Sequence, residues 1–174
     1  MRIHGRTIVL AAIVAALATA PAASAKKTYQ YSSSVTSAPV STSNGYPAPG
    51  GKAIMAGKLT TEPFGVGAVI DHVTVTGQPQ PNVFAFEGTE VDLFSDGTAG
   101  NTFTGTATVN ADGSQSVVID GRYNPAPNRS RNPVLFGPGG TGRYKGATGS
   151  YRFTGTVAPG SNVIVGTSTG SLTF

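Results

Sequence analysis

The sequence predicts an all-β protein: a closed eight-stranded antiparallel β-barrel that follows a signal peptide and a flexible N-terminal segment. Charged residues make up only 11% of the 174 residues, while 24 glycines and 12 prolines supply turns, a composition typical of short strands joined tightly. Beyond the leader, apolar residues recur at every second position and not at helical spacing. About eight such segments at even spacing favour a closed barrel over a flat sheet with open edges.

The first 25 residues have the pattern of a signal peptide. Arg2 and Arg6 form a short basic region, residues 8–17 are apolar, and Ala23-Ser24-Ala25 has the small-x-small pattern of a cleavage site. The apolar run is short for a membrane span. We therefore expect cleavage after Ala25, a secreted mature protein, and no stable membrane anchor after cleavage.

Residues 26–52 are predicted to form a flexible arm or linker outside the barrel. Residues 28–36 alternate weakly and fit either an edge strand or an arm, while residues 37–52 carry Pro, Gly and Ser throughout. This interpretation places the barrel domain at residues 53–174.

Period-2 alternation marks the strands of the barrel domain. In order, these segments are residues 53–60, 66–76, 83–94, 101–109, 114–123, 150–157 and 162–174. Asp112-Gly113 predicts a tight hairpin, because this dipeptide tolerates the backbone of such turns. Residues 78–82 are predicted to be a loop because two prolines do not fit inside a central strand. Residues 124–133 form a proline-rich basic loop.

Glycines within the strands predict local distortions. Gly105 and Gly155 are each flanked by threonines in the phrase Thr-Gly-Thr, which indicates a sharp bend or a close approach of other groups to the backbone. In residues 83–94 the apolar side chains change face between Phe86 and Val91, which predicts a bulge near Gly88.

Charge and cysteine content exclude several classes of function. Without the leader, the chain has 10 Lys and Arg and 8 Asp and Glu, a net charge of +2. This charge is too small to indicate nucleic-acid binding, so we expect no nucleic-acid partner. The chain has no cysteine, which excludes disulfides, thiol nucleophiles and cysteine-bound metals. Only His72 remains after cleavage, so we expect no multi-histidine metal site.

The glycine-rich stretch "GPGGTGRYKGATGSYRFTGTV" (137–157) can be read as a phosphate cradle or as a turn between strands. A P-loop requires Lys followed by Ser or Thr after its last glycine, and here Arg143 follows Gly142. A dinucleotide fingerprint requires G-x-G-x-x-G before a helix, and here the spacing is one residue too long and a strand pattern follows. A kinked turn between barrel strands is the reading that remains.

The same stretch resembles a segment of the allene oxide cyclase and dirigent barrel superfamily, in particular its bacterial secreted, barrel-like members. The residues that match this structural motif are Gly139, Gly140, Thr141, Gly142, Tyr144, Ala147 and Gly149. The resemblance implies a secreted eight-stranded barrel with a cavity, a trimeric homo-oligomer as in plant members, and action on small apolar or phenolic molecules without metal or organic cofactor. It assigns no catalytic residue to this chain.

Acidic side chains are the first candidates for a ligand site. Asp71 shares a face with valines of its strand, so it is either a pocket acid or the partner of an arginine. It cannot form a dyad with His72, because neighbours on a strand point to opposite faces. Glu90 and Asp92 share a face and fit either paired carboxylates for acid–base work or a solvated face with cross-strand ion pairs. Arg122 is a candidate donor beside these acids.

Tyrosines are the second group of candidates. Tyr123 and Tyr144 lie near strand ends and can stack on the ring of a ligand, or they can form barrel wall with their hydroxyls in water. The ligand-binding candidates are therefore Asp71, Glu90, Arg122, Tyr123 and Tyr144.

Three functions stay open from the sequence. The first is a secreted barrel that binds a small apolar or phenolic molecule, because eight strands can enclose one small ligand. The second, implied by the resemblance alone, is a cofactor-free isomerase or cyclase, or a dirigent-like guide of coupling. The third is a structural or adhesive extracellular protein with a filled barrel. The enzyme requires an acid and a positioned donor inside the barrel, and the binding protein requires a cavity.

Overall fold

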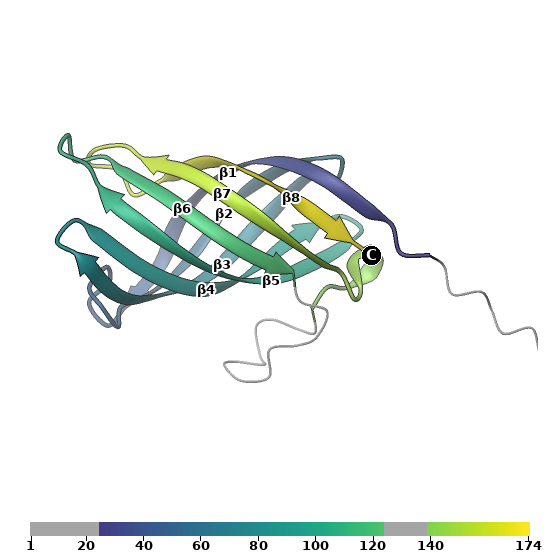
Figure 1. Ribbon diagram of the computed structural model, residues 1–174, viewed down its shortest axis with the longest axis horizontal. Helices are drawn as coiled ribbons and strands as arrows, with labels where there is room; N and C mark the ends of the chain where they lie inside the picture. Colours follow the sequence, from purple (N-terminus) through teal and green to yellow (C-terminus); the bar gives the residue numbers. More distant parts are fainter. Residues whose placement is uncertain (1–24, 124–138) are drawn as a thin grey trace, which may run out of the picture.

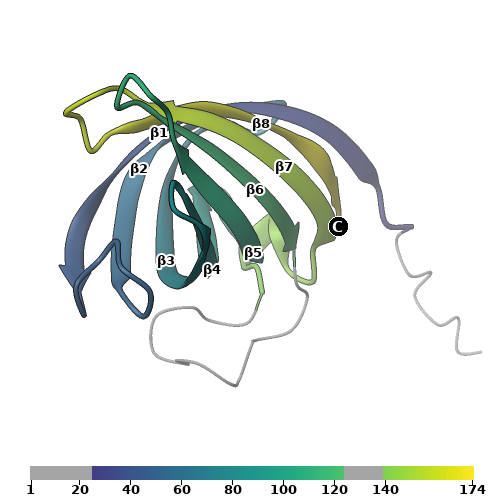
Figure 2. The ribbon, with the colours of Figure 1, turned by 60° about the vertical axis from the view of Figure 1, so that its left-hand side comes forward.

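The computed structural model describes residues 25–123 and 139–174, and within them eight strands form one closed barrel (Figure 1, Figure 2). The strands are β1 (Thr28–Ser43), β2 (Lys52–Glu62), β3 (Gly65–Gln80), β4 (Val83–Phe94), β5 (Gly97–Val109), β6 (Gln115–Tyr123), β7 (Thr148–Val157) and β8 (Ile164–Thr173). Each strand pairs antiparallel with the next, and β8 returns to β1. The predicted all-β, closed eight-stranded antiparallel barrel is confirmed.

The prediction that residues 26–52 lie outside the barrel as a flexible arm is wrong. The barrel begins at Thr28, because β1 pairs along its length with β2 on one side and with β8 on the other. Its inward face carries small hydroxyl residues such as Ser33 and Ser37, both of which are buried. Because serine is polar on either face of a strand, the sequence of β1 does not show the alternation of apolar and polar residues that marks the other strands. Only residues 44–51 form turns between β1 and β2.

The predicted loop at residues 78–82 is shorter than expected. Strand β3 continues to Gln80 and therefore includes Pro79. Its register with β4 shifts between Val75 and Gln80, and a proline is tolerated in a strand where the regular ladder is interrupted.

The predicted bulge near Gly88 is absent. The register of β4 with β3 is unbroken between Val75 and Ala68, so the even-numbered residues of this part of β4 share one face. Phe86 and Asp92 on that face are buried. A bulge would have kept the apolar side chains of β4 on one face; the regular strand instead turns Glu90 and Asp92 inward.

Glycines in the strands make room for aromatic rings, including both glycines of the Thr-Gly-Thr phrase. A Cβ atom added at Gly105 would lie 2.6 Å from the ring of Phe86, and one added at Gly155 would lie 2.5 Å from the ring of Phe153. These rings, with Phe103, belong to the buried core of the barrel. The glycines therefore serve the packing of rings against the backbone.

The segment that follows residue 138 is a turn bonded to the β4–β5 turn and to the start of β5. The Thr141 amide donates to the Thr98 carbonyl oxygen at 2.8 Å, and the Arg143 amide donates to the Asp96 carbonyl oxygen at 3.1 Å. The Thr141 hydroxyl also bonds the Thr98 hydroxyl at 2.9 Å. The segment forms a turn and a short 3-10 helix, and the next strand begins only at Thr148.

This turn places one aromatic side chain against the end of the barrel. Gly140 and Gly142 adopt φ values of +82° and +56°, which glycine accepts without strain. The short 3-10 helix η1 (Gly142–Tyr144) then buries the Tyr144 ring completely. That ring packs against Phe94 and Phe174, with centroid distances of 5.2 Å in both cases.

The predicted proline-rich loop at residues 124–133 and nearly all of the predicted signal peptide lie outside the described residues, so both stay predictions. Within the described ranges, no helix is both long and apolar enough to cross a membrane.

Candidate functional site

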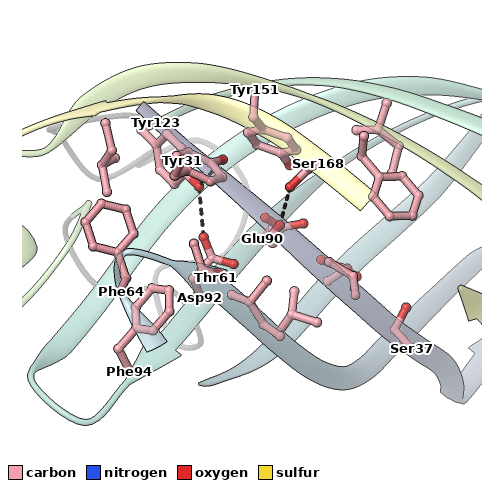
Figure 3. A pocket seen from close by; sticks show the side chains of 18 of the residues that line it. Tyr31, Ser37, Thr61, Phe64, Glu90, Asp92, Phe94, Tyr123, Tyr151 and Ser168 are labelled. Atoms are coloured by element: carbon pink, nitrogen blue, oxygen red, sulfur yellow. Dashed lines mark hydrogen bonds between the residues drawn. The ribbon is translucent and has the colours of Figure 1, made fainter. Parts of the chain in front are cut away.

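A cavity lies in the interior of the barrel, lined by side chains from its strands (Figure 3). The volume open to the centre of a water molecule is about 50 Å³. One water needs roughly 12 Å³ of such volume, so the cavity has room for about four waters. At about 30 Å³ of liquid volume per water, this equals a group of about 120 Å³. Its apolar walls include Phe64, Val69, Phe94, Ile119, Phe153 and Leu172. A largely apolar cavity with a few converging polar groups is the usual form of a small-molecule site.

One row of polar side chains crosses four neighbouring strands on the inside of the barrel. Asp71 on β3 is opposite Glu90 on β4, Glu90 is opposite Asn101 on β5, and Asn101 is opposite Tyr123 on β6. The Asn101 amide donates to the Glu90 carboxylate at 2.6 Å, and the Tyr151 hydroxyl donates to the Asn101 amide oxygen at 3.0 Å. Strand register alone brings these groups together.

A chain of hydrogen bonds links this row to β1. The Tyr123 hydroxyl donates to Oδ2 of Asp92 at 3.1 Å, and it lies 2.8 Å from the Tyr31 hydroxyl (Figure 3). Because Tyr123 donates its proton to Asp92, Tyr31 is the donor in their shared bond. The Ser168 hydroxyl bonds Ser33 and also interacts with Tyr31.

Two buried oxygen atoms that face the cavity have no hydrogen-bond partner: Oδ1 of Asp71 and Oγ1 of Thr61. Buried polar atoms of proteins are nearly always paired, so these two atoms mark a place where the protein alone does not complete its own bonding. Both atoms belong to side chains that line the cavity.

The carboxyl groups of the site hold their protons more tightly than usual. Burial raises the pKa of Asp71 well above its ordinary value, and the charge of Glu90 raises it further. The pKa of Asp92 is raised by the same two causes. Burial also raises the pKa of Glu90, against the opposing effect of the hydrogen bonds that Glu90 accepts from Asp71 and Asn101. Burial thus favours the neutral forms of Asp71 and Asp92, and Glu90 is the acceptor at the centre of the cluster.

The tyrosine hydroxyls of the cavity stay protonated. Burial raises the pKa values of Tyr31, Tyr123 and Tyr151, and the nearby acids raise those of Tyr123 and Tyr151 further. These hydroxyls consequently act as hydrogen-bond donors and do not act as bases near neutral pH.

The structure brings together three of the five candidate residues. Asp71, Glu90 and Tyr123 all line the cavity. Arg122 does not, because it alternates with the buried Gly121 and Tyr123 and is exposed on the outer surface. Tyr144 also does not line the cavity; it packs at the end of the barrel, where burial raises its pKa to about 12.

The structure also decides the positions of His72 and of the Tyr123 hydroxyl. His72 follows Asp71 on β3, and of the two only Asp71 lines the cavity, as expected for neighbours on a strand. The Tyr123 hydroxyl is buried in the hydrogen-bonded chain, so the alternative of a hydroxyl in water is wrong.

Sequence reasoning missed four members of the site. Tyr31 was assigned to the flexible arm, and Tyr151 was not among the ligand-binding candidates. Asn101 was available from alternation, since it is two residues from the buried Phe103. Asp92 was recognised as a possible paired carboxylate with Glu90, but it was not among the ligand-binding candidates.

No group of three His, Cys, Asp or Glu side chains in the described ranges is placed to hold a metal ion. Comparison of the chain with protein-family models, with curated proteins and with solved structures finds no match. The argument for function therefore rests on the site itself.

Proposed function

We propose that the protein is a secreted barrel that binds one small, largely apolar or phenolic molecule in its central cavity. The observation that carries this proposal is the unfilled space beside two unpartnered buried oxygens, on Asp71 and Thr61. A barrel with a purely structural role fills its interior with side chains and satisfies its polar groups. The cavity therefore counts against the alternative of a filled, adhesive barrel.

Native mass spectrometry of the mature protein recovered from its own secretions tests this function. We expect an excess mass of one small molecule per chain, which disappears when the protein is unfolded in urea, washed and refolded. The subunit masses also decide whether the protein is a homo-oligomer, such as the trimer that the resemblance implies. Protein that carries no excess mass and whose melting temperature does not respond to a panel of small phenols contradicts the proposal.

A second candidate is a cofactor-free isomerase or cyclase, or a dirigent-like guide of coupling. It is favoured by one observation: carboxyl groups whose pKa is raised by burial and tyrosine donors face the same apolar cavity, which is what general acid catalysis requires. Incubation of the molecule found by mass spectrometry with wild-type protein and with Asp71→Asn separates the two candidates. Loss of conversion with retained binding supports the enzyme, and an unchanged molecule in both samples supports the binding protein.

A further inference from the structure

The cavity concentrates acidic groups without a positive partner. Asp71, Glu90 and Asp92 line it, and no Lys, Arg or His among the described residues does so. On the outer surface, by contrast, Asp120 pairs with Arg152 at 3.0 Å. Burying carboxyl groups without a countercharge costs free energy, and nothing in the packing of the barrel requires three of them at this place.

The hydrogen bonds of the site show what is lacking. The Tyr123 proton is given to Asp92, the Tyr151 proton to Asn101, and an Asn101 amide proton to Glu90. These donors are already used, whereas Oδ1 of Asp71 is an acceptor that receives nothing. Oδ1 of Asp71 therefore lacks a donor, and no positive charge lines the cavity; a protonated amine would supply both.

We propose that the cavity selects a small organic cation, an ammonium group on a compact apolar or aromatic body, with Asp71 as its principal anchor. This inference rests on the proposed binding function and narrows its ligand class. An ammonium group has three donors and no acceptor, so it completes Asp71 and can also use the free hydroxyl of Thr61. The rings of Tyr31 and Phe64, which line the same cavity, offer faces for a cation–π contact.

Binding of a cation is expected to release a proton. In the empty site, burial and the charge of Glu90 raise the pKa values of Asp71 and Asp92 and so favour their protonated forms, whereas an ammonium favours the charged form of the carboxyl that it contacts. The other titratable groups around Asp71 are Tyr31, Tyr123 and Tyr151, whose protons stay bound at neutral pH. The released proton therefore comes from the carboxyl cluster, and a neutral ligand releases none.

The cavity size defines suitable probes. Space for about 120 Å³ corresponds to roughly one substituted benzene ring, as estimated from the volume of about four waters. Benzylamine, benzyl alcohol and benzoate have the same ring with a positive, a neutral and a negative group. Isothermal titration of the washed and refolded protein with these three probes, at pH 7 in two buffers of different ionisation enthalpy, measures affinity and proton release together.

We expect benzylamine to bind about tenfold more tightly than benzyl alcohol, since a hydrogen bond to a charged group contributes about 1.5–3 kcal/mol and tenfold corresponds to about 1.4 kcal/mol. Benzoate should not bind. In Asp71→Asn the preference for the amine and the released proton should be lost while benzyl alcohol still binds, which shows that the variant is folded. Asp120→Asn, an equal change of charge on the outer surface, should keep both.

Each other outcome overturns the inference. If benzyl alcohol binds as tightly as benzylamine, the cavity takes small molecules without selecting a cation, and the proposed binding function stands. An equal loss of preference in Asp120→Asn assigns the effect to overall charge and not to Asp71. If no probe binds, the cation selectivity is rejected, and the mass of the secreted protein decides separately on the binding function.

Discussion

Tyr151 reaches the polar row because Gly121 leaves space for its ring. A Cβ atom at Gly121 would lie 2.6 Å from the Tyr151 hydroxyl oxygen, closer than real Cβ contacts allow, and closer still to the ring. The Tyr151 hydroxyl supports Asn101, which in turn supports the Glu90 carboxylate. The absence of a side chain at Gly121 therefore allows the contacts that position the Glu90 carboxylate.

Gly121→Ala is therefore expected to destabilise the barrel by about 1–3 kcal/mol, the usual cost of overpacking a core. Urea unfolding measures the change. Gly77→Ala on β3 is the matched control, because a Cβ atom there meets nothing within 4 Å, and its effect should stay within about 0.5 kcal/mol. Equal effects of the two substitutions would contradict the contact between Gly121 and Tyr151.

The acidic cluster predicts an unusual dependence of stability on pH. The folded pKa of Asp71 is raised above its usual value of 3.8, so the folded state binds more protons than the unfolded state above pH 4. The free energy of unfolding therefore falls as pH rises from about 4 towards neutral, by up to about 1.4 kcal/mol per pH unit for each such proton. Glu90 and Asp92 act in the same direction. His72, whose pKa is lowered by burial, acts in the opposite direction near pH 6.

Asp71→Asn removes one of these protons and should flatten the decline, so that the variant is more stable than wild type at pH 8. Urea unfolding at intervals from pH 4 to pH 8 follows both proteins. A wild-type stability that rises across this range, with the same slope in the variant, would show that the carboxyl groups are ionised at little cost in the folded state.

At the scale of elements, alternation predicted most strands and part of the site. The valine face of β3 placed Asp71 inward, and the apolar face of β6 placed Tyr123 there, because a period of 2 fixes the face of every residue. The same logic failed in β1, where inward Ser33 carries no apolar signal. It also failed in β4, where Glu90 breaks the rule that interiors are apolar. Both failures lie in the walls of the cavity, where a binding site departs from the pattern of a packed core.

The turn before β7 is expected to stabilise the aromatic end of the barrel through Thr141. Its hydroxyl accepts from the Thr98 amide at 3.2 Å and bonds the Thr98 hydroxyl at 2.9 Å. Thr141→Val should lower the free energy of unfolding by about 1 kcal/mol, the typical contribution of such bonds. Thr167→Val on the exposed face of β8 is the control, and thermal unfolding should show almost no change for it. If Thr141→Val unfolds at the same temperature as the wild type, the backbone hydrogen bonds alone hold the turn.

At the scale of the whole molecule, closure depends on β1. A chain that begins at Lys26 should fold to a cooperative β-protein, whereas a chain that begins at Ala53 lacks the strand between β2 and β8 and leaves both edges open. Circular dichroism and urea unfolding compare the two chains. Cooperative folding of residues 53–174 alone would restore the domain boundary that composition suggested.

The order of the strands also has a consequence for how the chain reaches this structure. Seven of the eight pairings join strands that follow one another, and only β1 with β8 joins the two ends of the barrel. Neighbouring hairpins close small loops quickly, but the last pairing must close a loop of more than 100 residues, such as Thr28 with Thr173. Until it does, the curled sheet presents two unpaired edges to other copies of itself. During refolding, closure of the barrel within one chain therefore competes with pairing of strand edges between chains, and dilution favours closure.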